Sequence, residues 1–524
     1  MNRYVPIAIL LLSFSLGWNC KDNIEEAMPV LTGIKVTPDI LNLSIGEVQQ
    51  LKAEPIPSDV PEVSFTWSSD NKNVATVSTS GTVTGIAAGT VHITVKSGSV
   101  EKRIPVSVSP AAFKVSIGNT VYVIDTLDYA EIAPGVTWFK FSIPEFVNGF
   151  GTLGKGLVVN SLEVDVSSPT SNRLEVCPAS PATWGNVERP TAMYARKRAI
   201  LEAEGYKPVA VINGDFYLLS ANNTTGYAYI NNRPLGMEIA NGMVVQTPYT
   251  ASYTSGFIIK DNGTLDHHDQ LSFSGQVDAG GQSFPLAEVN GFAKRGELVL
   301  FNNLANSYPT DSAFAWSPYT STMVSLSYPE GEWRVNDRME FIVKEIEYNV
   351  ETTIPAASPY KGKDFNGQGA ILVGNESAGN DSKTFLDNLK VGDRVGVQMD
   401  IKSGTIKISD KRIHTVGYGD VILRHGSPVE TWKEAHPRTA IGYSLLKDKA
   451  YLVVIDGRQS NYSVGATTGQ VGAILKALGA YSAVNLDGGG SSAMVVNGEV
   501  KNKPSDTNER AVANGIMVTT RINN

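Results

Sequence analysis

The sequence predicts a small all-β sandwich followed by a larger α+β domain with a mixed β-sheet and few helices. Three observations carry this prediction. The 524 residues exceed the length of one ordinary domain. The composition, with 49 Gly, 26 Pro and 18% charged residues, is globular and rich in turns. Apolar and polar residues alternate along many short segments, whereas few segments have the periodicity of a helix.

The N-terminus has the pattern of an export signal. Arg3 precedes an apolar run over residues 5–16 that is too short to span a bilayer. Cys20 stands where a bacterial lipoprotein signal is cleaved and its cysteine acylated, so we expect a signal peptide over 1–20 and a tether over 21–28. This pattern predicts a lipoprotein of the outer membrane or cell surface of a Gram-negative bacterium, or a periplasmic protein. Simple secretion is the alternative.

Residues 29–109 consist of short alternating segments with turn signals at regular intervals, which is typical of a β-sandwich. The segment resembles the bacterial Ig-like domain of group 2. The matching residues are Val36-Thr37-Pro38, Trp67-Ser68-Ser69-Asp70, Val74-Ala75-Thr76-Val77, Gly81-Thr82-Val83-Thr84-Gly85 and Ala88-Gly89-Thr90. The resemblance implies a spacer that holds the next domain off the membrane, with an adhesion module as the alternative.

A hinge at about residue 110 leads to the second domain, over 113–524. One helix is predicted over 191–204, with Gly205 just beyond it. Another is predicted to begin after Thr468, whose hydroxyl can cap the free N–H groups, and to stop at Gly479. Strands interrupted by a few helices predict an α+β domain.

Five runs in the second domain place polar or charged residues beside an apolar strand. They are Asn-Gly-Asp-Phe-Tyr at 213–217, Arg-Thr-Ala-Ile-Gly at 438–442, Asp-Gly-Arg at 456–458, Asn-Leu-Asp-Gly-Gly-Gly-Ser-Ser at 485–492 and Glu-Arg at 509–510. A carboxylate at the end of a buried strand is held rigidly and needs a partner. In the fourth run, glycine N–H groups and serine hydroxyls can surround an anion.

The order of these five motifs resembles the phosphodiester glycosidase family, over roughly residues 120–520. The resemblance implies hydrolysis of a sugar-1-phosphodiester, such as an N-acetylglucosamine-1-phosphodiester. The sugar would be released and a phosphomonoester left on a cell-envelope or extracellular glycan. Residues 213–217 depart from the Asn-Ala-Gly-Phe-Phe of many relatives. The motif-poor region 250–415 is expected to set substrate choice.

Glycosidic cleavage ordinarily uses two carboxyl groups. The expected catalytic pair is Asp487 and Asp215, with Asp456 or Glu509 as replacements for Asp215. The departing phosphate is expected to be stabilised by guanidinium groups, serine hydroxyls and backbone N–H groups. The expected substrate-binding residues are Asn213, Arg438, Thr439, Arg458, Asn485, Gly488, Gly489, Gly490, Ser491, Ser492 and Arg510.

The net charge of −8 argues against a nucleic-acid partner. No metal ligand set is predicted, although the clustered aspartates leave a bound Ca²⁺ or Mg²⁺ open. Two other functions are open. One is a surface carbohydrate-binding or adhesion lipoprotein with a non-catalytic pocket. The other is an exopolysaccharide hydrolase that does not require phosphate.

Overall fold

The computed structural model describes residues 29–109, 114–147, 154–179, 187–219, 232–250, 252–291, 295–302, 319–352, 369–379 and 381–522. The chain divides into two compact units, with the boundary between Ala111 and Ala112. The predicted signal peptide, the tether and Cys20 lie outside the described residues.

The first unit is an all-β sandwich. Its strands are β1 (Gly33–Thr37), β2 (Leu41–Ser44), β3 (Val48–Gln50), β4 (Lys52–Ile56), β5 (Thr66–Ser69), β6 (Ala75–Val77), β7 (Thr82–Gly85), β8 (Gly89–Ser97) and β9 (Val100–Ser109). They form sheets of order β2-β9-β8-β5, β3-β7-β6 and β1-β4. Ile93 and Val95 of β8 and Ile104 of β9 are buried in a common core, as a side-chain period of two requires.

The second unit is built around two sheets. The first contains β12 (Asp125–Ala133), β13 (Val136–Ile143), β14 (Leu157–Asp165), β33 (Lys449–Ile455), β32 (Arg438–Tyr443), β34 (Ser482–Asn485), β30 (Asp420–Arg424) and β31 (Ser427–Pro428), in that order. The second contains β15 (Asn172–Pro178), β37 (Asn514–Arg521), β16 (Tyr206–Asn213), β35 (Met494–Val496) and β36 (Glu499–Val500), in that order. A separate hairpin pairs β10 (Lys114–Ile117) with β11 (Thr120–Val123).

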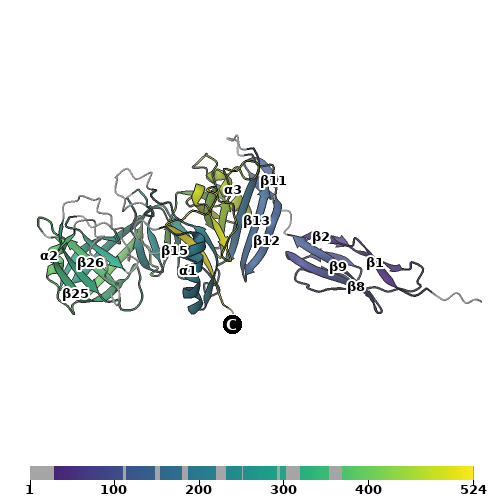
Figure 1. The fold of residues 1–524 in the computed structure, drawn as a ribbon, viewed down its shortest axis with the longest axis horizontal. Coiled ribbons are helices and arrows are strands. Elements are labelled where there is room, and N and C mark those ends of the chain that lie inside the picture. Colours follow the sequence, from purple (N-terminus) through teal and green to yellow (C-terminus); the bar gives the residue numbers. More distant parts are fainter. Residues whose placement is uncertain are drawn as a thin grey trace, which may run out of the picture. The chain divides into compact units, whose positions relative to one another are not determined.

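These two sheets pack face to face between two helices (Figure 1). Ile441 and Val454 of the first sheet share a core with Ile212 and Ile516 of the second. Helix α3 (Thr468–Leu478) covers the outer face of the first sheet, and helix α1 (Pro190–Ala203) covers the outer face of the second. The predicted fold class, an α+β domain behind an all-β sandwich, is confirmed.

A large insertion lies between β16 and β30. Its smaller sheet has the order β18 (Met243–Gln246), β17 (Glu238–Ala240), β29 (His414–Gly417), β19 (Gly256–Ile259) and β20 (Leu265–His268). Its larger sheet has the order β21 (Leu271–Ala279), β22 (Gln282–Val289), β23 (Leu298–Asn302), β26 (Ala370–Asn375), β24 (Tyr319–Leu326), β25 (Arg338–Thr352), β27 (Arg394–Ser403) and β28 (Ile406–Lys407). Strand β21 also pairs with β27, so this sheet closes on itself, and the short helix α2 (Ser382–Asp387) packs against it.

Local sequence explains where α3 begins and ends. The Thr467 hydroxyl accepts the N–H of Gln470, and the Gln470 side chain accepts the N–H of Thr467 in return. Gly479 ends the helix in the left-handed conformation, with φ 112°. The predicted cap at Thr468 was therefore wrong by one residue. The Thr468 hydroxyl instead accepts the N–H of Trp432 at 2.9 Å, which fixes the loop before β32.

The strand ends bring the motifs together. In the first sheet Ala440 pairs with Asn485, so the start of β32 lies beside the end of β34. In the second sheet Asn213 pairs with Gly515, so the end of β16 lies beside the start of β37. The Asn213 side-chain amide donates to the Asp487 carbonyl at 2.7 Å and joins the two sheets at this end.

Candidate active site

Two acids from distant segments, Asp215 and Asp487, share the end of the two sheets. The Asp215 side chain is 3% exposed, and its Oδ2 accepts the N–H of Gly236 at 2.8 Å. Burial raises the pKa of Asp215 to about 7, and the charge of Asp487 contributes to that rise. The Cα of Gly417 packs against this carboxyl, and a side chain at position 417 would overlap it.

Asp487 lies at the rim of the site and is partly exposed. Burial raises its pKa to about 6, while a hydrogen bond from Ser491 and the charge of Arg510 act in the opposite direction. Near pH 7 Asp487 is therefore mostly ionised, whereas Asp215 is close to half protonated. Two neighbouring carboxyl groups with separated pKa values suit one anionic and one proton-donating role.

A third acid, Glu238, completes a buried acidic cluster. It is 2% exposed, and burial together with the charge of Asp215 raises its pKa to about 8. Its Oε1 has no hydrogen-bond partner among the described residues. The sequence analysis did not identify Glu238. Its only signal is a lone acid between the apolar Met237 and Ile239.

Arg510 and Tyr217 also lie near Asp487. The Arg510 Nη1 lies 3.5 Å from the Ser491 Oγ, and its Nε donates to Asp506 at 2.9 Å. Tyr217 is 8% exposed, and burial and the charge of Asp487 raise its pKa. The motif at 213–217 thus contributes Tyr217 as well as Asp215, a role that the sequence analysis did not assign.

The glycine run forms a 3-10 turn over Gly489–Ser491 that two guanidinium groups flank. A methyl group added at Gly489 would lie 3.1 Å from the Arg458 Nη2, and one added at Gly490 would overlap Arg510. Larger residues would therefore displace either guanidinium. Arg458 is exposed, has φ 60° and forms no ion pair with any described residue. Its charge is available to a ligand.

Arg438 points away from this turn. It is 1% exposed, and it donates from Nε to the Ala466 carbonyl at 3.0 Å and from Nη2 to the Glu434 carbonyl at 2.7 Å. Burial lowers its pKa to about 10. The side-chain atom of Arg438 nearest to Gly488 is Cδ, which would lie 3.8 Å from a methyl group added at that glycine. These contacts join the loop before β32 to the segment that precedes α3.

Two of the expected substrate-binding residues, Asn213 and Thr439, form hydrogen bonds inside the protein. The Asn213 Oδ1 accepts the Thr439 hydroxyl at 2.7 Å and the N–H of Ala493 at 3.1 Å. Asn213 and Thr439 therefore hold the loops together. By contrast, both polar atoms of the Asn485 amide and the Ser492 hydroxyl are buried and have no hydrogen-bond partner among the residues that the structure describes. An unpaired buried amide costs stability, so Asn485, unlike Asn213, has polar atoms that a ligand can satisfy.

The two alternative acids lie in structural positions. Asp456 is 1% exposed and accepts the N–H of Lys503 at 2.9 Å, the Asn502 amide at 3.2 Å and the Tyr462 hydroxyl at 3.1 Å. Glu509 accepts the hydroxyl and N–H of Thr191 in the first turn of α1. The structure does not bring either acid into the cluster around Asp487.

An aromatic pair borders the site. The rings of Phe216 and Trp432 lie 6.1 Å apart, and the Arg438 guanidinium lies 5.3 Å from the centre of the Trp432 ring. Trp432 is 43% exposed, which leaves much of its surface open to a ligand. The sequence analysis did not identify Trp432, because a lone tryptophan in a loop has no motif.

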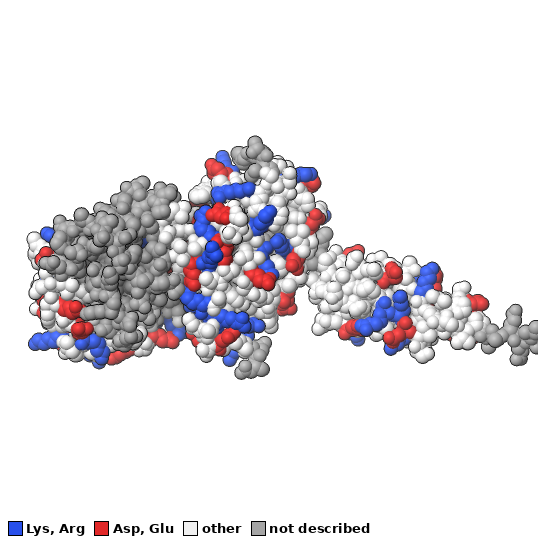
Figure 2. Space-filling model, in the orientation of Figure 1, with Lys and Arg blue, Asp and Glu red and all other residues white. Residues whose placement is uncertain are grey.

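Figure 2 shows acidic and basic side chains intermixed on the face in view. Among the described residues, no three His, Cys, Asp or Glu side chains are grouped to hold a metal ion. The part of the chain that the structure describes also contains no helix long and apolar enough to cross a membrane. Cys177 is buried, and burial raises its pKa to about 11.

One solved structure has a similar fold, and another is more distant. A protein of Burkholderia pseudomallei assigned as exported is 16% identical, with a TM-score of 0.55 over 78% of this chain and 98% of its own. The catalytic domain of zebrafish N-acetylglucosamine-1-phosphodiester α-N-acetylglucosaminidase, auto-inhibited by its pro-peptide, is 13% identical. Its TM-score is 0.35, over 78% of this chain and 90% of that domain.

Among curated proteins, an alpha-L-arabinofuranosidase of Bifidobacterium longum is 38% identical over 82 residues, which are 15% of this chain. This match spans only 8% of that relative. Residues 348–519 match the phosphodiester glycosidase family, and residues 30–108 match the bacterial Ig-like domain of group 2. The chain therefore contains a bacterial Ig-like domain and, after it, a region over residues 348–519 that matches the phosphodiester glycosidase family.

Proposed function

We propose that the protein hydrolyses a sugar-1-phosphodiester of the N-acetylglucosamine-1-phosphodiester type. The sugar is released, and a phosphomonoester remains on a cell-envelope or extracellular glycan. We also propose that the protein acts at the cell surface, held there by a lipid on Cys20, with the Ig-like domain as a spacer. The family match over 348–519 supports the reaction class.

One observation carries the proposal. A partly exposed carboxylate, Asp487, directly precedes a glycine turn that Arg458 and Arg510 flank. A carboxylate suits the anomeric carbon of the sugar, where positive charge develops in the transition state. Guanidinium groups suit the oxygens of the departing phosphate. The two requirements of the reaction are met side by side.

The pKa values assign the acids. Asp487, mostly ionised near pH 7, acts as nucleophile or as the base that activates water. Asp215 retains a proton to a higher pH because it is buried beside Asp487, so it serves as the proton reservoir. A phosphodiester is a good leaving group, so the stabilisation by Arg458 and Arg510 outweighs protonation.

We assign the sugar ring to the aromatic pair and Asn485. Phe216 and Trp432 provide an aromatic surface for the apolar face of the ring, and Asn485 an amide for its hydroxyls. A methyl group at Gly419 would lie 2.9 Å from the Phe216 ring and 3.6 Å from the Asn485 Nδ2. The glycine thus allows the ring and the amide to lie close together.

The proposal is tested by comparing a sugar-1-phosphodiester with the same sugar on a neutral aryl group. Replacing Arg458 with methionine should raise KM for the phosphodiester roughly 10-fold or more, because a charge-assisted contact to phosphate is lost. KM for the aryl glycoside should stay unchanged. Arg394→Met, in the closed sheet, is the matched control and should behave as wild type. Equal effects of Arg458→Met on both substrates would point to a hydrolase that does not use phosphate.

The aromatic surface has its own test. Trp432→Ala should raise KM for both substrates by roughly 10-fold while changing kcat little, because a stacking contact is present before and during the reaction. Trp432→Phe should restore most of the affinity. If Trp432→Ala lowers kcat but leaves KM unchanged, the ring does not bind the sugar.

A further inference from the structure

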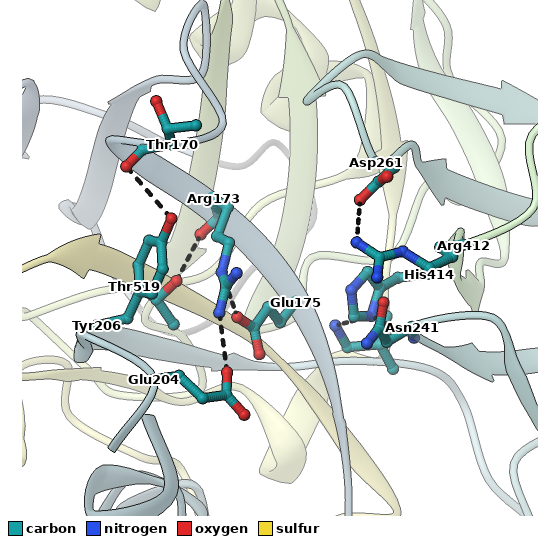
Figure 3. Close-up of polar contacts among 11 residues, drawn as sticks. Thr170, Arg173, Glu175, Glu204, Tyr206, Asn241, Asp261, Arg412, His414 and Thr519 are labelled. Carbon is teal, nitrogen blue, oxygen red and sulfur yellow. Dashed lines mark hydrogen bonds and ion pairs between the residues drawn. The ribbon is translucent and has the colours of Figure 1, made fainter. Parts of the chain in front are cut away.

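A separate cavity of about 770 Å³ lies beside α1, away from the acidic cluster. Its walls are β15, α1, the hairpins β17–β18 and β19–β20, and the residues that lead into β29. Pockets of this size commonly hold small ligands. Figure 3 shows two ion-paired groups in its lining, with Arg173 in one and Arg412 in the other.

His414 provides a fixed donor in this cavity. Its Nδ1 accepts the N–H of Val176 and the N–H of Asn241, both at 3.2 Å. With Nδ1 occupied as an acceptor, the ring hydrogen is on Nε2. Nε2 has no hydrogen-bond partner among the described residues and is not sealed from solvent. The ring thus connects β15 to the β17–β18 hairpin while it offers one N–H to a ligand.

The charges that act on this ring are all positive. Lys197, Arg173 and Arg412 lower the pKa of His414 to about 3, together with burial as the largest cause, so the ring is neutral at physiological pH. Lys197 forms no ion pair with any described residue, unlike the two arginines. The Nε2 hydrogen and the Lys197 ammonium are therefore both available to an anionic group.

The rest of the lining limits how much negative charge fits. Arg173 pairs with Glu175 at 2.7 Å and with Glu204 at 3.4 Å, and Arg412 pairs with Asp261 at 3.2 Å and with Glu332. These carboxylates would repel a second charge on the ligand. The paired arginines and acids also present both donors and acceptors, which suit hydroxyl groups.

We propose that this cavity binds a monoanionic, polyhydroxylated molecule, such as a sugar acid, with its carboxylate between His414 and Lys197. A single carboxylate can accept a hydrogen bond from each of these two donors. The ring hydroxyls then meet the ion-paired side chains of the walls. This site is independent of the proposed hydrolysis, because none of its residues contacts Asp487 or the glycine turn in the part of the chain that the structure describes.

Calorimetric titration of the full chain tests the site, with glucuronate, glucose and inorganic phosphate as probes. Glucuronate should bind wild type at least roughly 10-fold more tightly than glucose, because only glucuronate carries the charge. Lys197→Met should weaken glucuronate binding to a similar extent. Arg198→Met, one residue further along α1 and paired with Glu202 at 2.8 Å, should leave it unchanged.

His414→Asn separates binding from folding. The asparagine oxygen can replace Nδ1 as the acceptor for β15, while the Nε2 donor is removed. This variant should keep the wild-type melting temperature and lose glucuronate affinity. Arg458→Met should remove phosphate binding at the glycine turn and leave glucuronate binding intact. Equal affinity for glucose and glucuronate, or glucuronate binding that Lys197→Met leaves unchanged, would overturn the proposal.

Discussion

Replacing Asp487 with asparagine should lower kcat for a sugar-1-phosphodiester by roughly 1,000-fold or more, because the carboxylate acts on the anomeric carbon in the transition state. The fold should survive. The N–H of Asp487 donates to the Gly214 carbonyl at 3.0 Å, and its carbonyl accepts the Asn213 amide at 2.7 Å. Both are main-chain contacts that asparagine retains.

The measurement is single-turnover hydrolysis, with thermal unfolding followed in parallel. Asp448→Asn removes a carboxylate of the β32–β33 hairpin that accepts the Ser444 hydroxyl, and it should retain wild-type kcat. A surface carbohydrate-binding protein gives a different result. Wild type would then show sugar binding without turnover, and Asp487→Asn would reduce affinity alone.

The positions of the motif residues follow from local sequence patterns, namely the ends of apolar runs and the caps of helices. Asn213, Arg438 and Asn485 stand at strand ends because apolar runs stop there, and the pairing of Ala440 with Asn485 brings two of these ends together. Thr467 and Gly479 bound α3 by capping, which acts within a few residues. Such local signals are readable without a structure.

The remaining features depend on contacts between segments far apart in the chain. The closure of the larger inserted sheet rests on pairs such as Gly275 with Met399. The turn of Arg438 toward the Ala466 and Glu434 carbonyls depends on how two loops pack. The position of Trp432 is fixed by Thr468, whose hydroxyl accepts a hydrogen bond from the Trp432 backbone N–H. No periodicity or motif encodes these arrangements.

Replacing Glu238 with glutamine should change the free energy of unfolding differently at different pH. The substitution should be more favourable by several kcal/mol at alkaline pH than at acid pH. The pKa of Glu238 is raised to about 8 in the folded state, whereas an unfolded chain has its ordinary value near 4.5. Between these two values the folded state holds a proton that the unfolded state has released. The contribution of Glu238 to the free energy of unfolding is therefore fully present below its pKa in the unfolded chain. That contribution is lost as the pH rises toward 8.

At about 1.4 kcal/mol per pKa unit, the loss is on the order of 4 kcal/mol. Glutamine is neutral at every pH, so the variant should not show this pH-dependent loss of stability. Urea unfolding at pH 4.5, 6 and 8 measures the effect, with Glu202→Gln on the exposed side of α1 as the control that should follow wild type. Because Glu238 is still protonated when Asp215 titrates near pH 7, glutamine at position 238 should leave the pKa of Asp215 and the corresponding midpoint in the pH dependence of kcat nearly unchanged. If Glu238→Gln and wild type lose stability in parallel between pH 4.5 and 8, Glu238 is already ionised in the folded protein, and the buried acidic cluster does not hold the proton that we assign to it.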